Sequence, residues 1–396
     1  MTDLIGGRDR ASAPMLPYVL PDATGDTGDG AQFTTGVLPY QRLEALIGST
    51  IIPEDPPAEG QLQPASLDLR LGDVAWRVRS SFLPGPRSTV EGKLAETSGI
   101  MHEIDLAGGA VLERGCVYII PLQESLRLKV QDELAGFVNP KSSVGRLDVF
   151  TRVITDYATE FDRVARGYRG RLYAEVSPRT FSVLVRRGSR LAQLRFRRGT
   201  PPLGEERLRQ LHDEHGLVDT PDASIRGNTV ALTLDLEGAG PGSLVGFRAR
   251  RNTGVVDVDC RGELEAARFW EPIHAAANLI LDPDEFHILA TRERVRVPPD
   301  HAAEMAAYDT LVGEFRVHYA GFFDPGFGWS ADGGAGAKAV LEVRSHEVPF
   351  LLEHGQIMGR LAFERLTERP SVLYGADLGS HYQDQSLALS KHFSAG

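Results

Sequence analysis

The sequence predicts a mainly β protein made of two copies of one domain, each a sandwich or distorted barrel with a few short helices. Short segments alternate apolar and polar residues with a period of two, and turn residues separate them about every ten positions. The same residues also recur at a fixed spacing of 167 positions, which indicates an internal duplication. The recurring pairs are Asp68 and Asp235, Glu175 and Glu342, Gly188 and Gly355, and Phe196 and Phe363.

The chain divides into five parts. Residues 1–36 are rich in Gly, Asp, Pro and Thr, so we expect a flexible arm. The first copy spans 37–204; it opens with a helix over 38–47 behind a proline and continues with strands near 65–71, 117–121 and 182–185. A linker at 205–228 starts with an exposed helix over 205–214, and the second copy follows at 229–369. The tail, 370–396, has no counterpart after the first copy.

The composition excludes several classes of protein. At 396 residues the chain is long enough for two cores. A net charge of −11 argues against a nucleic acid polymer as partner. Two cysteines without a Cys/His cluster exclude a disulfide scaffold and argue against zinc. The sequence has no apolar run of membrane-spanning length and no secretory pattern at its start, so we expect a cytoplasmic protein with no membrane partner.

The first copy carries a candidate phosphate clamp. Two hydroxyls lie between two cations in Lys141-Ser142-Ser143-Val144-Gly145-Arg146. Hydroxyls and turn amides bind phosphate oxygens while Lys and Arg neutralise them. A serine turn with a solvated lysine and a surface arginine is the alternative interpretation of this segment. In the second copy the same register reads Tyr308-Asp309-Thr310-Leu311-Val312-Gly313, without the cations or the serine pair. We therefore expect only the first copy to bind phosphates.

The second copy carries a candidate hairpin and a candidate base. Asp-Pro-Gly predicts a tight turn between phenylalanines in the segment from Ala320 to Gly328. Glu342 follows in an apolar strand, where burial would give its carboxyl the raised pKa of a general base; a position facing solvent is the alternative. The first copy keeps the glutamate as Glu175, and its version of the hairpin, around Phe161-Asp162-Arg163, lacks the Asp-Pro-Gly turn.

Together these motifs resemble the dCTP deaminases of the dUTPase-like superfamily, and the resemblance covers nearly all of the chain from about residue 37 onward. It rests on five segments: Gln63 to Gly72, Lys141 to Arg146, Phe323-Asp324-Pro325-Gly326-Phe327, Leu341-Glu342, and the ending Tyr374-Gly375 with Gly379 to Gln385. The resemblance implies two tandem dUTPase-like domains.

The resemblance also implies the chemistry of a zinc-independent hydrolase that supplies dUTP for thymidylate synthesis. In such enzymes dCTP and water give dUTP and ammonia, with Mg²⁺ carried by the triphosphate and no metal bound by the protein. A strand glutamate activates the water that attacks C4 of cytosine, a role that falls here to Glu342 or Glu175. Hairpin backbone groups hold the base, and the C-terminal tail closes over the nucleotide. The sequence agrees in having no His-x-Glu with Pro-Cys-x-x-Cys.

The family's sites lie between the subunits of a homotrimer, whereas this chain divides the motifs between its own copies. We therefore expect a homo-oligomer, such as a trimer of two-domain chains, with a composite site. Its catalytic residues would be Glu342, Arg146 and Ser142, with Glu175 as the alternative glutamate. Its substrate-binding residues would be Lys141, Ser143, Ala320, Phe323, Asp324, Phe327, Tyr374, Tyr382 and Gln385. The opposite combination, Glu175 with Tyr308-Asp309-Thr310, should be inactive.

Two alternatives stay open. Asp324 occupies the hairpin position from which dUTPases activate water, so a dUTPase or a bifunctional enzyme that also hydrolyses dUTP is the first; the turn-forming role of Asp in Asp-Pro-Gly is the competing interpretation. The second is a nucleotide-binding protein without activity.

Overall fold

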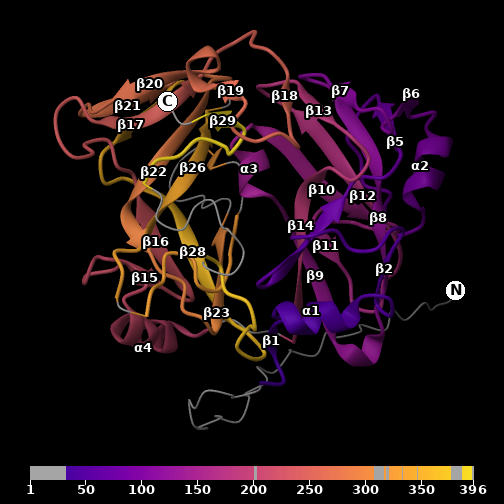
Figure 1. The fold of residues 1–396 in the computed structure, drawn as a ribbon, viewed down its shortest axis with the longest axis horizontal. Coiled ribbons are helices and arrows are strands. Elements are labelled where there is room, and N and C mark those ends of the chain that lie inside the picture. Colours follow the sequence, from indigo (N-terminus) through magenta and orange to yellow (C-terminus); the bar gives the residue numbers. More distant parts are fainter. Residues whose placement is uncertain are drawn as a thin grey trace, which may run out of the picture.

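The computed structural model describes residues 33–199, 203–306, 316–317, 321–331, 333–345, 347–375 and 386–394. The chain forms two β halves that lie side by side, the first coloured indigo to magenta and the second orange to yellow (Figure 1). Each half contains two antiparallel sheets, and residues from both sheets make its core. The prediction of a mainly β chain with a few short helices is confirmed.

The first half holds two six-stranded sheets. One contains β1 (Gly36–Val37), β3 (Leu62–Gln63), β4 (Ser66–Arg70), β9 (Leu134–Pro140), β11 (Arg163–Val164) and β14 (Arg190–Arg198), in the order β11-β9-β14-β4-β3 with β1 paired to β14. The other contains β2 (Ile51–Pro53), β5 (Val74–Val78), β6 (Ile100–Asp105), β8 (Val117–Arg127), β10 (Val149–Thr155) and β12 (Arg169–Pro178), in the order β10-β12-β8-β5-β6 with β2 paired to β8.

The second half holds two five-stranded sheets within its described residues. The first has the order β15-β16-β28-β23-β25, with β15 (Ile225–Arg226), β16 (Thr229–Thr233), β23 (His301–Ala306), β25 (Phe322–Phe323) and β28 (Ile357–Arg365). The second has the order β20-β17-β22-β26-β24, with β17 (Leu244–Ala249), β20 (Trp270–His274), β22 (Phe286–Val295), β24 (Arg316–Val317) and β26 (Ala337–Arg344). A separate ribbon pairs β21 (Asn278–Leu281) with β27 (Phe350–Glu353).

Short helices accompany the strands. They are α1 (Tyr40–Leu46), α2 (Val90–Glu96), α3 (Ser142–Gly145), α4 (Glu205–His215) and the 3₁₀ turns η1 (Val130–Asp132) and η2 (Ala266–Arg268). α1 and α4 lie where the sequence predicts helices, and Gly216 ends α4 in the left-handed region. α2 was not predicted; Thr89 caps it by accepting the Gly92 amide. No helix of the described residues is long and apolar enough to cross a membrane.

Strand pairing confirms one of the repeat pairs, Phe196 with Phe363, and corrects another. Phe196 lies opposite Gly136 and Phe363 opposite Ala303, so both partners follow the 167-residue spacing. In contrast, Leu67 lies opposite Leu194 and Val230 opposite Leu361. Leu67 and Val230 are therefore equivalent, and they are 163 rather than 167 residues apart, because the second copy has four more residues between the two strands that pair. The match of Asp68 with Asp235 is therefore wrong, and Ala231 takes the position of Asp68.

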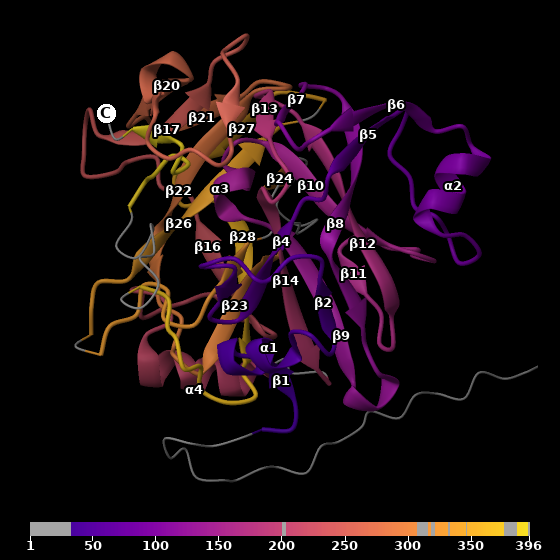
Figure 2. The ribbon, with the colours of Figure 1, turned by 45° about the vertical axis from the view of Figure 1, so that its right-hand side comes forward.

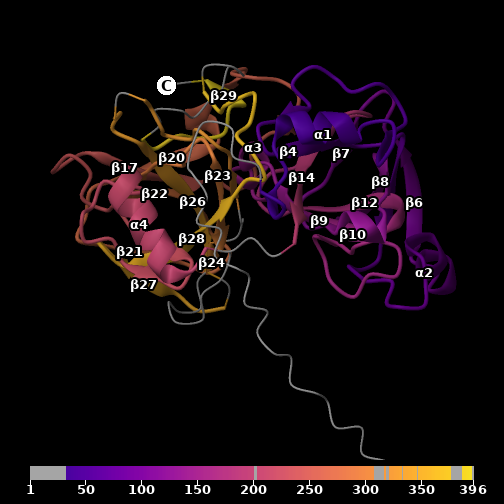
Figure 3. The same cartoon turned by 90° about the horizontal axis from the view of Figure 1, so that it is seen from below.

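The two halves share part of one core. β18 (Val256–Asp257) of the second half pairs with β13 (Val183–Val185), which also pairs with β7 (Ala110–Leu112). Nearby, the Phe181 ring contacts Trp270 with centroids 5.3 Å apart. The chain end joins this cluster, since β29 (Phe393–Ser394) pairs with β19 (Leu264–Glu265). The two halves remain side by side when the molecule is turned by 45° and when it is seen from below (Figures 2 and 3).

Candidate active site

The candidate clamp forms a single helical turn at the junction of the halves. Lys141 is the N-cap of α3, and the Arg146 amide closes the turn by donating to the Ser142 carbonyl. Ser142 is half-buried, whereas Ser143 and Arg146 are buried. The turn thus directs the Arg146 side chain away from solvent, toward the second half.

Glu342 reaches the same junction from β26, which lies beside α3 (Figures 1 and 2). Neighbouring residues of a strand point to opposite faces. Leu341 and Val343 enter the core of the second half, while Val340 packs into the core shared with the first half. Glu342 therefore faces the first copy, and the possibility that it faces solvent is excluded by its 6% exposure.

The structure brings Arg146 and Glu342 together across the two copies. Arg146 Nε lies 3.9 Å from Glu342 Oε1, and both side chains are buried. Burial raises the pKa of Glu342 to about 7, and the positive charge of Arg146 offsets part of the rise. A carboxyl with this pKa exchanges a proton readily near neutral pH.

Glu175 lies elsewhere, within its own copy. It is buried and forms an ion pair with Arg152, whose guanidinium also stacks on the Phe161 ring at 3.5 Å. The arginine beside Glu175 thus comes from the same copy, whereas the arginine beside Glu342 comes from the other copy.

The hairpin contains the predicted turn. The Phe327 amide donates to the Asp324 carbonyl at 3.0 Å, and Gly326 has a φ of 94°. Pro325 followed by a glycine with positive φ is the pattern of a type II turn. Phe323 and Phe327 pack edge to face with centroids 5.0 Å apart. Pairing with β23 places Phe323 at the position of Val164 in the first copy, so the sequence match with Phe161-Asp162-Arg163 is wrong.

The Asp324 side chain forms an ion pair with an arginine from the first copy. Arg195 Nη2 lies 3.2 Å from Asp324 Oδ1, and both residues are buried. Burial raises the pKa of Asp324, and Arg195 counteracts this rise. Lys141 and Asp68, which form an ion pair with each other, lie close enough to act on the same carboxyl. The clamp and the hairpin are thus neighbours.

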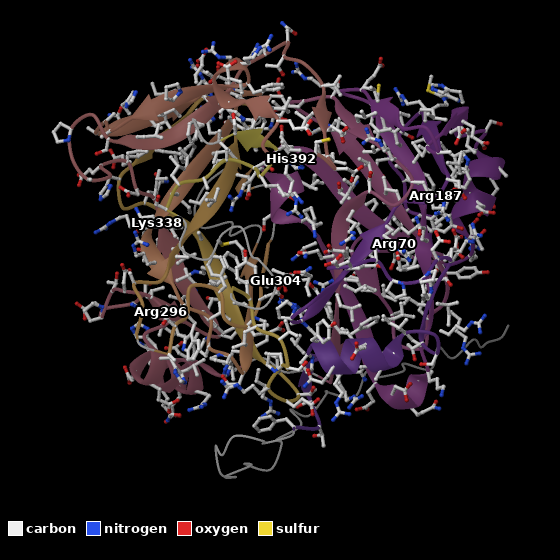
Figure 4. All side chains as sticks on the ribbon, viewed as in Figure 1. Arg70, Arg187, Arg296, Glu304, Lys338 and His392 are labelled. Atoms are coloured by element: carbon white, nitrogen blue, oxygen red, sulfur yellow. The ribbon has the colours of Figure 1, made fainter. Side chains whose placement is uncertain are left out.

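Parts of the tail also reach the site. The Tyr374 amide donates to the Pro325 carbonyl at 2.9 Å, and its ring lies 5.7 Å from that of Phe327. Ser390 Oγ donates to the Ser143 carbonyl at 2.6 Å, and Arg146 Nη1 donates to the Ala388 carbonyl at 3.0 Å. His392 lies at the junction of the halves (Figure 4). The predicted residues Ala320, Tyr382 and Gln385, and the segment Tyr308-Asp309-Thr310, lie outside the described residues.

Sequence reasoning missed Arg195, Ser390 and Lys391. Burial and, to a smaller extent, the charge of nearby Lys141 lower the pKa of Lys391 to about 8, which places a third cation beside the clamp. No local pattern marks these residues, because each contacts a segment distant in sequence. Among the described residues, no group of three or more His, Cys, Asp or Glu side chains is arranged to hold a metal ion.

Comparison with known proteins gives a consistent result. Residues 34–200 match the N-terminal domain and residues 204–393 the C-terminal domain of 2'-deoxycytidine 5'-triphosphate deaminase. The chain is 31% identical over 175 residues to the dCTP deaminase, dUMP-forming, of Mycolicibacterium gilvum, covering 43% of this chain and 83% of the relative. It is 36% identical over 110 residues to the protein of that name from Halobacterium salinarum, covering 27% of this chain and about half (52%) of the relative.

A solved structure, that of 2'-deoxycytidine 5'-triphosphate deaminase from Agrobacterium tumefaciens, is similar over most of its length. It is 55% identical, with a TM-score of 0.80, and the match covers 84% of this chain and 99% of that one. The chain described here belongs to the dCTP deaminase family.

Proposed function

We propose that this protein deaminates dCTP to dUTP and ammonia at the junction of its two copies. The observation that carries the proposal is the buried Glu342, with a pKa of about 7, opposite Arg146 of the other copy. Similarity to deaminases over both family domains supports the same reaction.

The residues divide the work as follows. The Glu342 carboxylate takes a proton from water as the oxygen bonds to C4 of cytosine, and passes that proton to N3. It then moves the remaining hydroxyl proton to the amino group, which leaves as ammonia as the C4 carbonyl forms. Arg146 holds Glu342 in place and stabilises negative charge near it. Lys141, Ser142 and Ser143 bind the triphosphate, which brings Mg²⁺ with it. Phe323, Phe327 and Tyr374 build the hairpin wall, whose backbone reads the base.

Single substitutions test the assignment of the base. Glu342→Gln should lower kcat for ammonia release by about 10²- to 10⁴-fold, because it removes the proton acceptor. Arg146→Ala should cost about 10²- to 10³-fold. Glu175→Gln is the matched control, since it changes the equivalent glutamate, and its kcat should stay within about threefold of wild type. Loss of activity in Glu175→Gln alone would overturn the composite site.

The products separate this reaction from its alternatives. Incubation with dCTP and Mg²⁺ should give dUTP and ammonia, whereas dUMP and pyrophosphate would indicate the bifunctional enzyme. Tight binding of dCTP without ammonia would indicate a binding protein. EDTA should stop the reaction and Mg²⁺ should restore it, in keeping with a metal carried by the nucleotide.

The homo-oligomer and the cytoplasmic location remain predictions. Because Arg146 and Glu342 meet within one chain, we propose one working site per chain. Light scattering with assays at the same protein concentrations tests whether assembly matters: activity per chain that falls on dissociation would show that other chains contribute to the site.

A further inference from the structure

A second ion pair crosses between the copies next to the proposed base. Arg344 Nη2 contacts the carboxylate of Asp148, and both side chains are buried. Thr180 Oγ1 bridges the two, lying 2.6 Å from Asp148 Oδ2 and 2.7 Å from Arg344 Nη2. Arg344 also donates from Nη1 to the Asp284 carbonyl at 2.7 Å, which orients the guanidinium.

The two ion pairs are in register. Glu342 and Arg344 are two residues apart on β26, so they point to the same face, toward the first copy. Arg146 and Asp148 are likewise two residues apart, directly after α3. Arg146 faces Glu342 and Asp148 faces Arg344, with the charges reversed from one pair to the next. The reversal disfavours a shift of one segment along the other, because a two-residue shift would bring like charges together.

This second pair belongs only to the working side of the duplication. At the 167-residue spacing the residue equivalent to Arg344 is Ser177, which has no charge. Glu175, two residues before Ser177, has its arginine on the adjacent strand β10 instead. The Asp148–Arg344 ion pair thus lies beside Glu342, the glutamate whose arginine comes from the other copy.

We propose that Asp148, Arg344 and Thr180 are positioning residues that hold Arg146 against Glu342. The inference rests on the proposed function and extends it to residues that do not touch substrate. A buried ion pair resists displacement because separating its charges leaves them uncompensated. The Asp148–Arg344 pair lies two residues beyond Arg146 and Glu342 on their two segments. It therefore fixes the distance between the Arg146 guanidinium and the Glu342 carboxylate, on which the pKa and the alignment of that carboxylate depend.

Asp148→Asn tests the proposal, because it removes the charge while keeping the shape. We expect kcat to fall about 10- to 100-fold with KM within about threefold, since a small misplacement affects the chemical step. Arg146 should move away from Glu342, which raises the pKa of Glu342 further. Activity needs the carboxylate, so the acid limb of the rate profile should move to higher pH by about half a unit or more. Thr180→Val should show the same changes at about 3- to 10-fold, and it serves as the test if Asp148→Asn does not fold.

Glu364→Gln is the matched control, because it removes a different carboxylate that pairs across the copies, with Arg197. It should lower Tm while leaving kcat and the acid limb unchanged. If Asp148→Asn and Thr180→Val behave like this control, the pair only joins the halves and the proposal is wrong.

A carboxyl titration separates this proposal from the proposed function. The ¹³C signal of Glu342, assigned with Glu342→Gln, reports its pKa without any substrate. Wild type that releases no ammonia would defeat the deaminase assignment, yet a higher pKa of Glu342 in Asp148→Asn would still support the positioning role. An unchanged pKa in both variants would defeat that role even in an active enzyme.

Discussion

At the scale of single residues, the buried Glu342 carboxyl holds its proton more tightly than an exposed glutamate does. Its pKa of about 7 lies above the ordinary value of 4.5, because burial disfavours the charged form. A group whose pKa is raised in the folded state binds more protons when folded. Between pH 4.5 and 7 the contribution of Glu342 to the stability of the protein therefore falls as pH rises.

Replacing Glu342 should consequently stabilise the protein at high pH. Glu342→Gln removes the buried negative charge, so the free energy of unfolding at pH 8 should increase by up to about 3 kcal/mol, with little change at pH 4. Urea denaturation at both values measures this. Glu175→Gln is the comparison: it removes the partner of Arg152 and should destabilise at pH 8. A Glu342→Gln protein less stable than wild type at pH 8 would contradict the assigned pKa.

At the scale of elements, the hairpin is fixed where backbone approaches backbone. Gly328 has a φ of 61°, and a Cβ there would lie 2.2 Å from the Val295 carbonyl oxygen and 2.7 Å from the Ala337 amide nitrogen. Only glycine fits this position, which ties the end of the hairpin to the start of β26. The hairpin and the strand that carries Glu342 are thereby held in one arrangement.

Gly328→Ala should therefore disturb both binding and stability. The added Cβ forces the hairpin away from β26, so we expect a loss of about 2 kcal/mol or more in unfolding free energy and a KM for dCTP raised about tenfold. Gly333→Ala provides the control, because Gly333 also has a positive φ (77°) but open space around it. Equal effects of the two substitutions on KM would show that the close approach is unimportant.

The helices and turns that depend on neighbouring residues could be predicted from local sequence patterns. The helices at α1 and α4 and the Asp-Pro-Gly turn follow from proline, glycine and apolar spacing. Pairings between distant segments, such as β29 with β19, have no local signature and were not predicted. The same holds for Arg195, whose partner Asp324 is 129 residues away.

At the scale of the molecule, the copies have become complementary. Arg197 and Glu364 occupy equivalent positions, 167 residues apart, and pair with each other at 2.8 Å. Glu304 also pairs with Arg197, and it lies between the halves in Figure 4. If two first copies packed in this way, Arg197 would face a second Arg197. If two second copies did so, Glu364 would face a second Glu364. The charges therefore favour pairing of unlike copies.

A charge exchange tests this complementarity. Arg197→Glu and Glu364→Arg should each destabilise the protein by about 3 kcal/mol or more, because each buries like charges together. The double variant should recover at least about 1 kcal/mol of the summed loss, measured by urea denaturation as a double-mutant cycle. Purely additive losses would mean that the two side chains do not specify how the copies pair.

The sequence by itself determined the mainly β class, the duplication and the family, and it proposed the candidate site residues, because periodicity, turn residues and motifs can be read from the order of residues. Three choices were left to the tertiary structure. It separated Glu342 from Glu175, since burial and the nearest arginine depend on packing between segments far apart. It moved Asp68 out of the repeat, since strand pairing counts inserted residues that a fixed spacing ignores. It also joined Asp148 to Arg344, since a contact across 196 residues exists only where the two copies meet.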